Sequence, residues 1–307
     1  MQPYIAGIGG ANVDIHGQSL SPIIMRDSNP GRLHLSMGGV TRNILDNLAR
    51  LGQRCQLISA VGEDAYGHML RTGCEQLGIG TQGLVTRPGA SSTYISIMDS
   101  AGDMLVAMSD MRILKDMDQQ FVADHLELLN GAEAVVCDAN LSPAAMEYLA
   151  THCTRPLYLD PVSTTWAKSV LPVLGRFHTI KPNRLEMEIL ADMPITSEKD
   201  LETACKKVLA LGVKRIFVSL GADGIFYSSA TGSIHRRSRQ FDRMENATGA
   251  GDATMAGILY ATLQGMDEND VLDFALGAGL VAISGADTIN PAMSVESINN
   301  MIKEYVK

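Results

Sequence analysis

The chain has 307 residues, of which 46% are hydrophobic and 19% are charged. This composition is typical of a globular protein with a substantial core, and it excludes a disordered or fibrous chain. The net charge of −9 argues against nucleic acid and anionic membranes as partners, because an acidic surface is repelled by both.

The amino-terminal segment and the cysteines favour a cytoplasmic protein. No basic segment precedes the short apolar run at the start of the chain, so we expect no signal peptide. No stretch approaches the roughly 20 apolar residues of a membrane-spanning helix. The five cysteines are dispersed and form no CxxC pair, so we expect reduced, buried thiols in a soluble chain.

The first part of the chain predicts alternating strands and helices. A short apolar run that ends in Gly-Gly indicates a strand leading into a turn. Apolar residues at helical spacing between Val40 and Leu51 indicate the first helix, and Gly52 follows as a stop signal. The elements predicted here are strand 4–10, helix 39–51, strand 56–62 and helix 64–77.

From Val135 onward, short apolar strands alternate with helices as in β-α-β units. This alternation predicts a parallel sheet covered by helices. No internal repeat or low-complexity linker divides the chain, so we expect one domain over residues 1–307. The elements predicted here are strands 135–138, 157–161, 178–183 and 215–221, and helices 184–192 and 198–211.

Two regions break this rhythm. Residues 17–37 contain turn residues with apolar residues at alternate positions, and residues 92–109 read as a hairpin around a turn at 100–103. They predict a small β-element outside the main sheet that covers a site. An ordinary edge hairpin is the alternative for the second region.

The segment NATGAGD, residues 246–252, predicts an anion site at a helix start. Its small residues let backbone N–H groups approach a ligand, and the apolar helix that follows attracts anions at its first turn. Asp252 could then take a proton from a hydroxyl that attacks a phosphate. Alternatively, Asp252 only caps the helix and the glycines permit close contact between segments.

Two further segments predict a sugar site. SMGGVTRN, residues 36–43, is a second glycine-rich loop before a helix, and the Asn43 amide could bind sugar hydroxyls, unless the loop is only a helix cap. GGANVDI, residues 9–15, places Asn12 and Asp14 just after the first strand, where ligands of open α/β sheets gather. Its glycines do not form the GxGxxG pattern of a dinucleotide site.

Two weaker segments follow strands later in the chain. In KPNRLE, residues 181–186, a carboxylate in the first helical turn suits Mg²⁺, although compensation of the helix dipole is the alternative. In SLGADG, residues 219–224, a glycine-flanked turn could hold a nucleotide or be a plain turn.

In this order and spacing, the five segments resemble the PfkB family of carbohydrate and nucleoside kinases, which has the ribokinase-like fold. The resemblance covers essentially the whole chain, and the two defining motifs match at 38–52 and 247–259. It implies an α/β three-layer sandwich with a mostly parallel central sheet and a small β lid, with lid sub-elements at about 15–37 and 92–110. It also implies a kinase that uses ATP and Mg²⁺ on a small sugar or nucleoside.

The resemblance gives each motif a role. Asp252 would be the catalytic base, and the anion hole would be formed by the N–H groups of Gly249, Ala250 and Gly251. The residues that would hold the sugar hydroxyls are Asn12, Asp14, Gly38, Gly39 and Asn43. The residues that would lie at the nucleotide are Lys181, Asn183, Ser219, Gly221 and Gly224, with Glu186 close to Mg²⁺, directly or through water.

Within the family, four segments look most like those of pseudouridine kinases, which phosphorylate the 5′-hydroxyl of pseudouridine. They are GGANVDI, GGVTRN, the Lys-Pro after a strand, and DTINPAMS at 287–294. This resemblance makes Thr41 and Arg42 candidates for subgroup-specific substrate contacts, and Asn140 a further candidate at a strand end. A free sugar such as ribose and other nucleosides are the competing substrates.

One departure concerns potassium. Many family members carry Asp-Thr-Thr before the GAGD motif, and the first Asp helps to bind a monovalent cation. Here Asn246 stands in its place, so K⁺ dependence is in doubt, although backbone carbonyls could still bind the ion.

Two other classes of function are disfavoured by the motifs. A regulator that binds a sugar or nucleoside without catalysis is disfavoured by the intact Asp252, and a dinucleotide-dependent oxidoreductase by the missing GxGxxG.

The alternating apolar residues of the 92–109 hairpin favour a homodimer formed through the lid.

Overall fold

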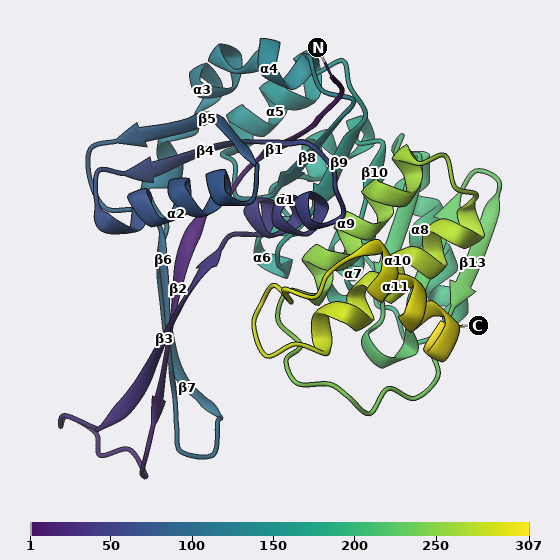
Figure 1. The fold of residues 1–307 in the computed structure, drawn as a ribbon. Helices are drawn as coiled ribbons and strands as arrows, with labels where there is room; N and C mark the ends of the chain where they lie inside the picture. Colours follow the sequence, from purple (N-terminus) through teal and green to yellow (C-terminus); the bar gives the residue numbers. More distant parts are fainter. Residues whose placement is uncertain (1, 307) are drawn as a thin grey trace.

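The computed structural model describes residues 2–306, and its centre is a nine-stranded sheet (Figure 1). The strand order is β13-β12-β11-β10-β9-β8-β1-β4-β5. All neighbours from β5 to β11 pair in parallel, whereas β12 and β13 are antiparallel. The strands are β1 (Ile5–Ile8), β4 (Cys55–Gly62), β5 (Gly80–Arg87), β8 (Ala134–Asp138), β9 (Leu157–Asp160), β10 (Thr179–Ile180), β11 (Arg215–Ser219), β12 (Ile225–Ser229) and β13 (Gly232–Arg236).

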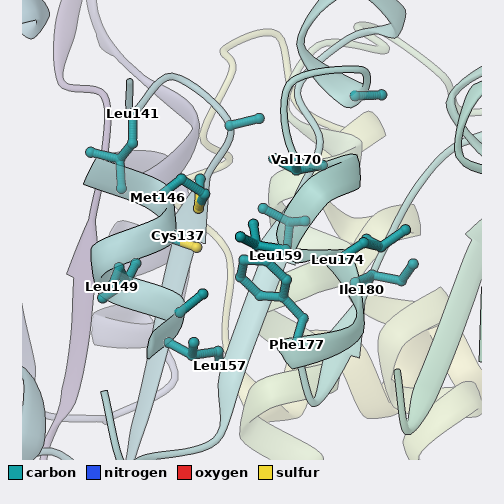
Figure 2. Packing of buried hydrophobic residues seen from close by; sticks show 14 of the residues in the cluster. Cys137, Leu141, Met146, Leu149, Leu157, Leu159, Val170, Leu174, Phe177 and Ile180 are labelled. Atoms are coloured by element: carbon teal, nitrogen blue, oxygen red, sulfur yellow. The ribbon is translucent and has the colours of Figure 1, made fainter. Parts of the chain in front are cut away.

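Helices cover both faces of this sheet, which confirms the expected three-layer α/β sandwich. Helices α3 to α8 pack on one face and helices α1, α2, α9, α10 and α11 pack on the other. Figure 2 shows part of the first face, where Leu149 of α5 lies near Leu157 of β9 and Phe177. The helices are α1 (Val40–Arg50), α2 (Ala65–Gln76), α3 (Gln119–Asp124), α4 (Leu126–Asn130), α5 (Pro143–His152), α6 (Thr164–Ala167), α7 (Arg184–Ala191), α8 (Glu198–Ala210), α9 (Ala250–Leu263), α10 (Glu268–Ile283) and α11 (Val295–Met301), with short turns η1 (Arg112–Asp116), η2 (Leu171–Arg176), η3 (Gly221–Asp223) and η4 (Ile302–Val306).

The central strands are short and apolar because both of their faces are covered. β1, β8 and β9 are buried along their whole length, as expected for parallel strands between two helical layers. The predicted strand 178–183 is shorter than expected, since β10 has only two residues. Pro182 has no N–H to donate, and Asn183 already caps α7.

A second, four-stranded sheet projects from the main body (Figure 1). Its order is β3-β2-β6-β7, with bounds β2 (Asn12–Ser19), β3 (Gly31–Gly38), β6 (Thr93–Met98) and β7 (Met104–Asp110). The predicted hairpin over 92–109 is present as β6 and β7, and β6 pairs in parallel with β2. β2 begins at Asn12, so the candidate residues Asn12 and Asp14 belong to this second sheet.

Helix length and the state of the cysteines bear on two further expectations. None of the helices in residues 2–306 is long and apolar enough to span a membrane. All five cysteines are free thiols, and four of them are buried while Cys153 is partly exposed.

Candidate active site

The two glycine-rich loops meet at the starts of α1 and α9. The Asn43 side-chain amide donates a hydrogen bond of 2.7 Å to Asp252 Oδ2. Asn43 lies in the first turn of α1 and Asp252 lies in the first turn of α9. The structure thus brings together two candidate residues that the sequence placed in separate motifs.

The start of α9 is an open backbone turn. Gly249 has φ 81° and no side chain caps the helix, so its first N–H groups are available to an anion. A Cβ at Gly249 would lie 2.0 Å from the carbonyl oxygen of Thr288, so only glycine fits there. Ala250 and Gly251 form the first turn, as predicted.

Asp252 is a buried carboxylate with an unusual proton affinity. Burial raises its pKa to about 7, and the nearby charge of Asp160 acts in the same direction. The Asn43 amide and the positive charges of Lys181 and Arg42 partly oppose this rise. A carboxylate that exchanges its proton near neutral pH is suited to act as a general base.

A buried ion pair lies beside Asp252. Lys181 Nζ is 3.1 Å from Asp160 Oδ2, and both side chains are less than a tenth exposed. Burial lowers the pKa of Lys181, but Asp160, Glu186 and Asp252 outweigh it and hold the pKa above its usual range. Lys181 also lies close to the α9 turn, because a Cβ on Gly251 would be 3.3 Å from its Nζ. Lys181 therefore remains positively charged between the carboxylates and the open turn.

Asn183 and Glu186 form a reciprocal cap at the start of α7. Glu186 accepts from the Asn183 backbone N–H at 2.9 Å and from its side-chain amide at 2.8 Å, and its own N–H donates to Asn183 Oδ1. Glu186 therefore caps α7, a role that neither the Mg²⁺ prediction nor the dipole alternative named, and each of its oxygens keeps one lone pair for a water molecule. Burial also raises the pKa of Glu186.

A cavity of about 730 Å³ opens next to the α9 turn. Four of the predicted nucleotide residues line this cavity, namely Asn183, Ser219, Gly221 and Gly224. Ala250 and Gly251 of the α9 turn also line it, and Phe241, Met244, Leu276, Leu280 and Ile283 provide apolar surface. A pocket of this size, with an apolar wall and a few polar groups, fits a nucleotide. No motif marked the apolar residues, which come from the segment before the GAGD turn and from α10.

The predicted sugar residues gather around the second sheet. Asn12 Nδ2 donates to Asp14 Oδ1 at 2.5 Å. A Cβ at Gly38 would lie 2.3 Å from Asp14 Oδ2, and one at Gly39, where φ is 97°, would lie 2.3 Å from the Gly10 carbonyl oxygen. The two glycines thus allow the loop to lie directly against β2 and the turn before it.

Asp138 holds the substrate-side loops together, although none of the sequence motifs includes it. Its carboxylate accepts bonds from Gly10 N–H at 2.8 Å, from Thr41 Oγ1 at 2.8 Å and from Asn140 N–H at 3.0 Å. Asp138 ends β8, so the rule that drew attention to Asp14, a carboxylate after a buried strand, could have found it. The same rule could have found Asp160 at the end of β9.

Thr41 and Arg42 are not free to contact a ligand in this structure. Thr41 is fully buried, and its hydroxyl donates to Asp138. Arg42 is 1% exposed, and it donates to the Gly38 carbonyl oxygen, to Asp46 and to Asn43. Thr41 and Arg42 thus lie beneath the surface of the site, whereas Asn140, the third candidate, stays partly exposed.

Comparison with known proteins agrees with this architecture. The model of the pfkB family of carbohydrate kinases matches residues 2–294. The chain is 35% identical over 302 residues to a pseudouridine kinase of Escherichia coli K12, which covers 98% of this chain and 96% of that protein.

Solved structures show the same fold. A candidate sugar kinase from Clostridium perfringens superposes with a TM-score of 0.90 at 35% identity, covering 99% of this chain and 97% of that one. A candidate ribokinase from E. coli, in complex with ATP and Mg²⁺, superposes with a TM-score of 0.85 at 20% identity, covering 99% of this chain and all of that one. The chain belongs to the pfkB family of carbohydrate kinases and is a phosphotransferase.

Proposed function

We propose that this kinase transfers the γ-phosphate of ATP to the 5′-hydroxyl of pseudouridine, with Asp252 as the base. The observation that carries the proposal is the position of Asp252. It is buried in the first turn of α9, bonded to Asn43 of the sugar loop and adjacent to Gly251 of the nucleotide cavity. A base at this junction can reach a hydroxyl that faces a bound phosphate.

The lining of the cavity suggests how a nucleotide would lie. Its base would pack on the apolar residues Phe241, Leu280 and Ile283, and its phosphates would lie at Gly251 of the α9 turn. There the N–H groups of Gly249, Ala250 and Gly251 would bind the transferring phosphoryl group. Lys181, held charged by Asp160, would neutralise part of the phosphate charge.

Mg²⁺ fits this site as an ion held mainly by phosphates and water. No group of three or more His, Cys, Asp or Glu side chains suited to a metal occurs within residues 2–306, so the protein offers no closed cage. The free lone pairs of the buried Glu186 suit a water ligand of the ion, and Mg²⁺ retains several waters in most sites. When bound, Mg²⁺ would neutralise charge on the phosphates and orient them.

The reaction then follows from the arrangement. Asn12 and Asp14 hold sugar hydroxyls, and the free oxygen of Asp252 accepts the proton of the 5′-hydroxyl. The deprotonated oxygen forms a bond to the γ-phosphorus while the bond between that phosphorus and the β–γ bridging oxygen breaks. ADP leaves with the bridging oxygen, and the N–H groups at the start of α9 stabilise the charge of the phosphoryl group in the transition state.

The choice of pseudouridine rests on similarity. The relative at 35% identity is a pseudouridine kinase, and four segments of this chain resemble that subgroup, including DTINPAMS at 287–294. Ribose or another nucleoside would use the same chemistry. A regulator without catalysis would not need a buried base with a pKa near neutrality.

The test is ADP release from Mg-ATP with pseudouridine, uridine, adenosine, inosine, ribose and fructose as acceptors. Strong turnover of pseudouridine with little turnover of uridine is the expected result. Faster turnover of ribose or uridine would contradict the substrate while leaving the kinase chemistry intact. Binding of one acceptor without ADP release would favour the regulator.

We propose that the enzyme works without a specific monovalent cation. Asn246 donates its amide to the Ala286 carbonyl oxygen at 3.0 Å, and its Oδ1 accepts from the Thr248 N–H at 2.9 Å. An amide that joins these two loops performs the bridging role of a cation. Replacement of K⁺ by Na⁺ or by an organic cation should therefore leave kcat unchanged.

We also propose that the lid forms a homodimer. Directly paired residues of neighbouring strands point to the same face of a sheet. The paired row of Leu35, Ile15, Ile95 and Met108 is entirely apolar, and Leu33, Ile97 and Val106 continue it in the next row. The members of this apolar lid face that are exposed are Leu33, Leu35, Ile95, Val106 and Met108. An exposed apolar face of this kind favours association with a second copy.

A further inference from the structure

Arg42 is the largest side chain that is fully buried, and the proposed reaction does not use it. Its Nε donates to the Gly38 carbonyl oxygen at 3.0 Å, and its Nη2 donates to the Met37 carbonyl oxygen at 2.8 Å. Its Nη1 pairs with Asp46 at 2.8 Å, and Nη2 also donates to Asn43 Oδ1. A buried guanidinium with this many partners is fixed in one orientation.

The contact with Asn43 decides which way the amide of that residue points. Because Oδ1 accepts from Arg42, Nδ2 must face the other side, where it donates to Asp252 Oδ2. The reversed amide would place an NH₂ group against the guanidinium and an oxygen against the carboxylate, and both contacts would be repulsive. Arg42 therefore selects the amide orientation that binds Asp252.

This orientation leaves Asp252 with one committed oxygen and one free oxygen. Oδ2 accepts from Asn43, so Oδ1 is the oxygen that keeps both lone pairs for a proton. The same guanidinium holds the carbonyl groups of Met37 and Gly38, which are the last two residues of β3. Arg42 thus joins the end of a lid strand to the carboxylate.

We propose that Arg42 is a positioning residue: it fixes the Asn43 amide against Asp252 and so presents the free carboxylate oxygen to the acceptor hydroxyl. The inference rests on the proposed role of Asp252 as base. It also explains why Arg42 and Thr41 are buried although they lie in the substrate loop, since both hold the loop from beneath.

The charged groups around Asp252 make the proposal testable by pH. Asp160 at the end of β9 raises its proton affinity, whereas Lys181 after β10, Arg42 on α1 and the Asn43 amide lower it. Removal of the Arg42 charge should therefore move the titration of Asp252 to higher pH. Asp46, which also pairs with Arg50 at 2.7 Å, keeps one cationic partner in such a variant.

The experiment compares Arg42→Gln, Arg42→Lys and Arg50→Gln with the parent enzyme. Arg50 pairs with the same Asp46 but does not contact Asn43, so it is the matched control. For Arg42→Gln we expect kcat to fall about 10²-fold, which is the lower end of the contribution of a positioned base. The acceptor KM should change less than kcat, and the acid limb of the kcat profile should move to higher pH.

Arg42→Lys keeps the positive charge but loses the planar set of guanidinium N–H donors. It should therefore retain the parent pH profile with an intermediate kcat. Arg50→Gln should match the parent in both. A folded Arg42→Gln variant with parental kcat and pH profile would overturn the proposal, and so would an equal loss in Arg50→Gln. If Arg42→Gln does not fold, Arg42→Lys tests the proposal instead. A parental kcat in Arg42→Lys would show that the guanidinium donors are not needed and would overturn the proposal.

A second measurement separates this inference from the proposed function. The ¹³C chemical shift of the Asp252 carboxylate, assigned by its loss in Asp252→Asn, can be titrated without substrate. An upward shift of its pKa in Arg42→Gln, and none in Arg50→Gln, is expected even if no acceptor of the panel is phosphorylated. An unshifted titration in Arg42→Gln would overturn the inference. Absence of ADP release with every acceptor of the panel would by itself overturn only the proposed substrate.

Discussion

Asn43 and Asp252 lie 209 residues apart in the chain and are joined by a hydrogen bond of 2.7 Å. The bond links the helix that follows the sugar loop to the helix that follows the anion turn. A change at either end should alter the chemistry more than the folding.

Asp252→Asn should fold, bind both substrates and lose about 10³-fold in kcat, because an amide cannot accept the hydroxyl proton. Steady-state ADP release and acceptor binding measured by calorimetry check this. Asp118→Asn is the matched control, since Asp118 caps α3 through its side chain and Asn caps a helix equally well. Retention of near-parental turnover by Asp252→Asn would rule out the assigned role.

The same substitution should change how stability depends on pH. The folded-state pKa of Asp252 is about 7, above the value of about 4 for an unfolded chain, so the native state binds more protons between these values. The free energy of unfolding should therefore fall as pH rises from about 4 to 7. Asp252→Asn removes this pH-dependent loss of stability. The Tm of the variant minus the parental Tm should therefore increase as pH rises across that range. A Tm difference that does not change with pH would contradict the raised pKa.

The pH profile of kcat/KM should show an acid limb near pH 7, because Asp252 must be ionised to accept a proton. Lys181→Met should move this limb upward, because Lys181 lowers the pKa of Asp252. It should also raise the KM for ATP about tenfold, in line with the loss of one hydrogen bond to a charged group. Lys206→Met, at an exposed lysine of α8, is the control and should leave both quantities at the parental values.

Gly249→Ala should damage the anion turn far more than Gly52→Ala damages the end of α1. Both glycines have φ close to 80°, so alanine pays the same backbone strain of about 1–2 kcal/mol at each. At Gly249, however, the new Cβ would meet the Thr288 carbonyl oxygen, whereas nothing lies within 4 Å at Gly52. Urea unfolding and kcat check the pair, and we expect kcat to fall about 10²-fold only in Gly249→Ala, from displacement of the turn.

Met108→Asp should convert the proposed dimer to a monomer, because it places a charge on the apolar lid face, at the edge strand β7. Met25 is equally exposed but lies in the loop between β2 and β3, outside that face, so Met25→Asp is the control. Light scattering after size-exclusion chromatography measures the mass. A monomeric parent, or a dimer that survives Met108→Asp, would contradict the proposal.

The local sequence was sufficient to predict each motif and the element that carries it. The 3.6-residue and two-residue periodicities reflect which faces of a helix or strand are buried, so they predicted the parallel sheet, the covering helices and the lid hairpin. The glycine-rich turns at 38–39 and 249–251 were recognisable from their small residues, and Gly39 and Gly249 have the positive φ that favours glycine. The match of these motifs to a known family gave the kinase class.

The sequence did not predict the contacts that tune the site. Asp138 and Asp160 were missed, although each ends a buried strand, and the apolar wall of the nucleotide cavity carries no motif. Arg42 was expected to reach the substrate because it lies in the substrate loop, but α1 turns it into the interior, where Asp46 and Asn43 hold it.

Periodicity and backbone sterics act between neighbours in the chain, so the sequence by itself determined the elements, the two helix starts and the candidate base. Burial and charge act between groups that only folding brings together. The tertiary structure therefore decided that Asp252 lies next to Asp160 and Lys181, that its pKa rises to about 7, and that Arg42 supports Asn43 from beneath.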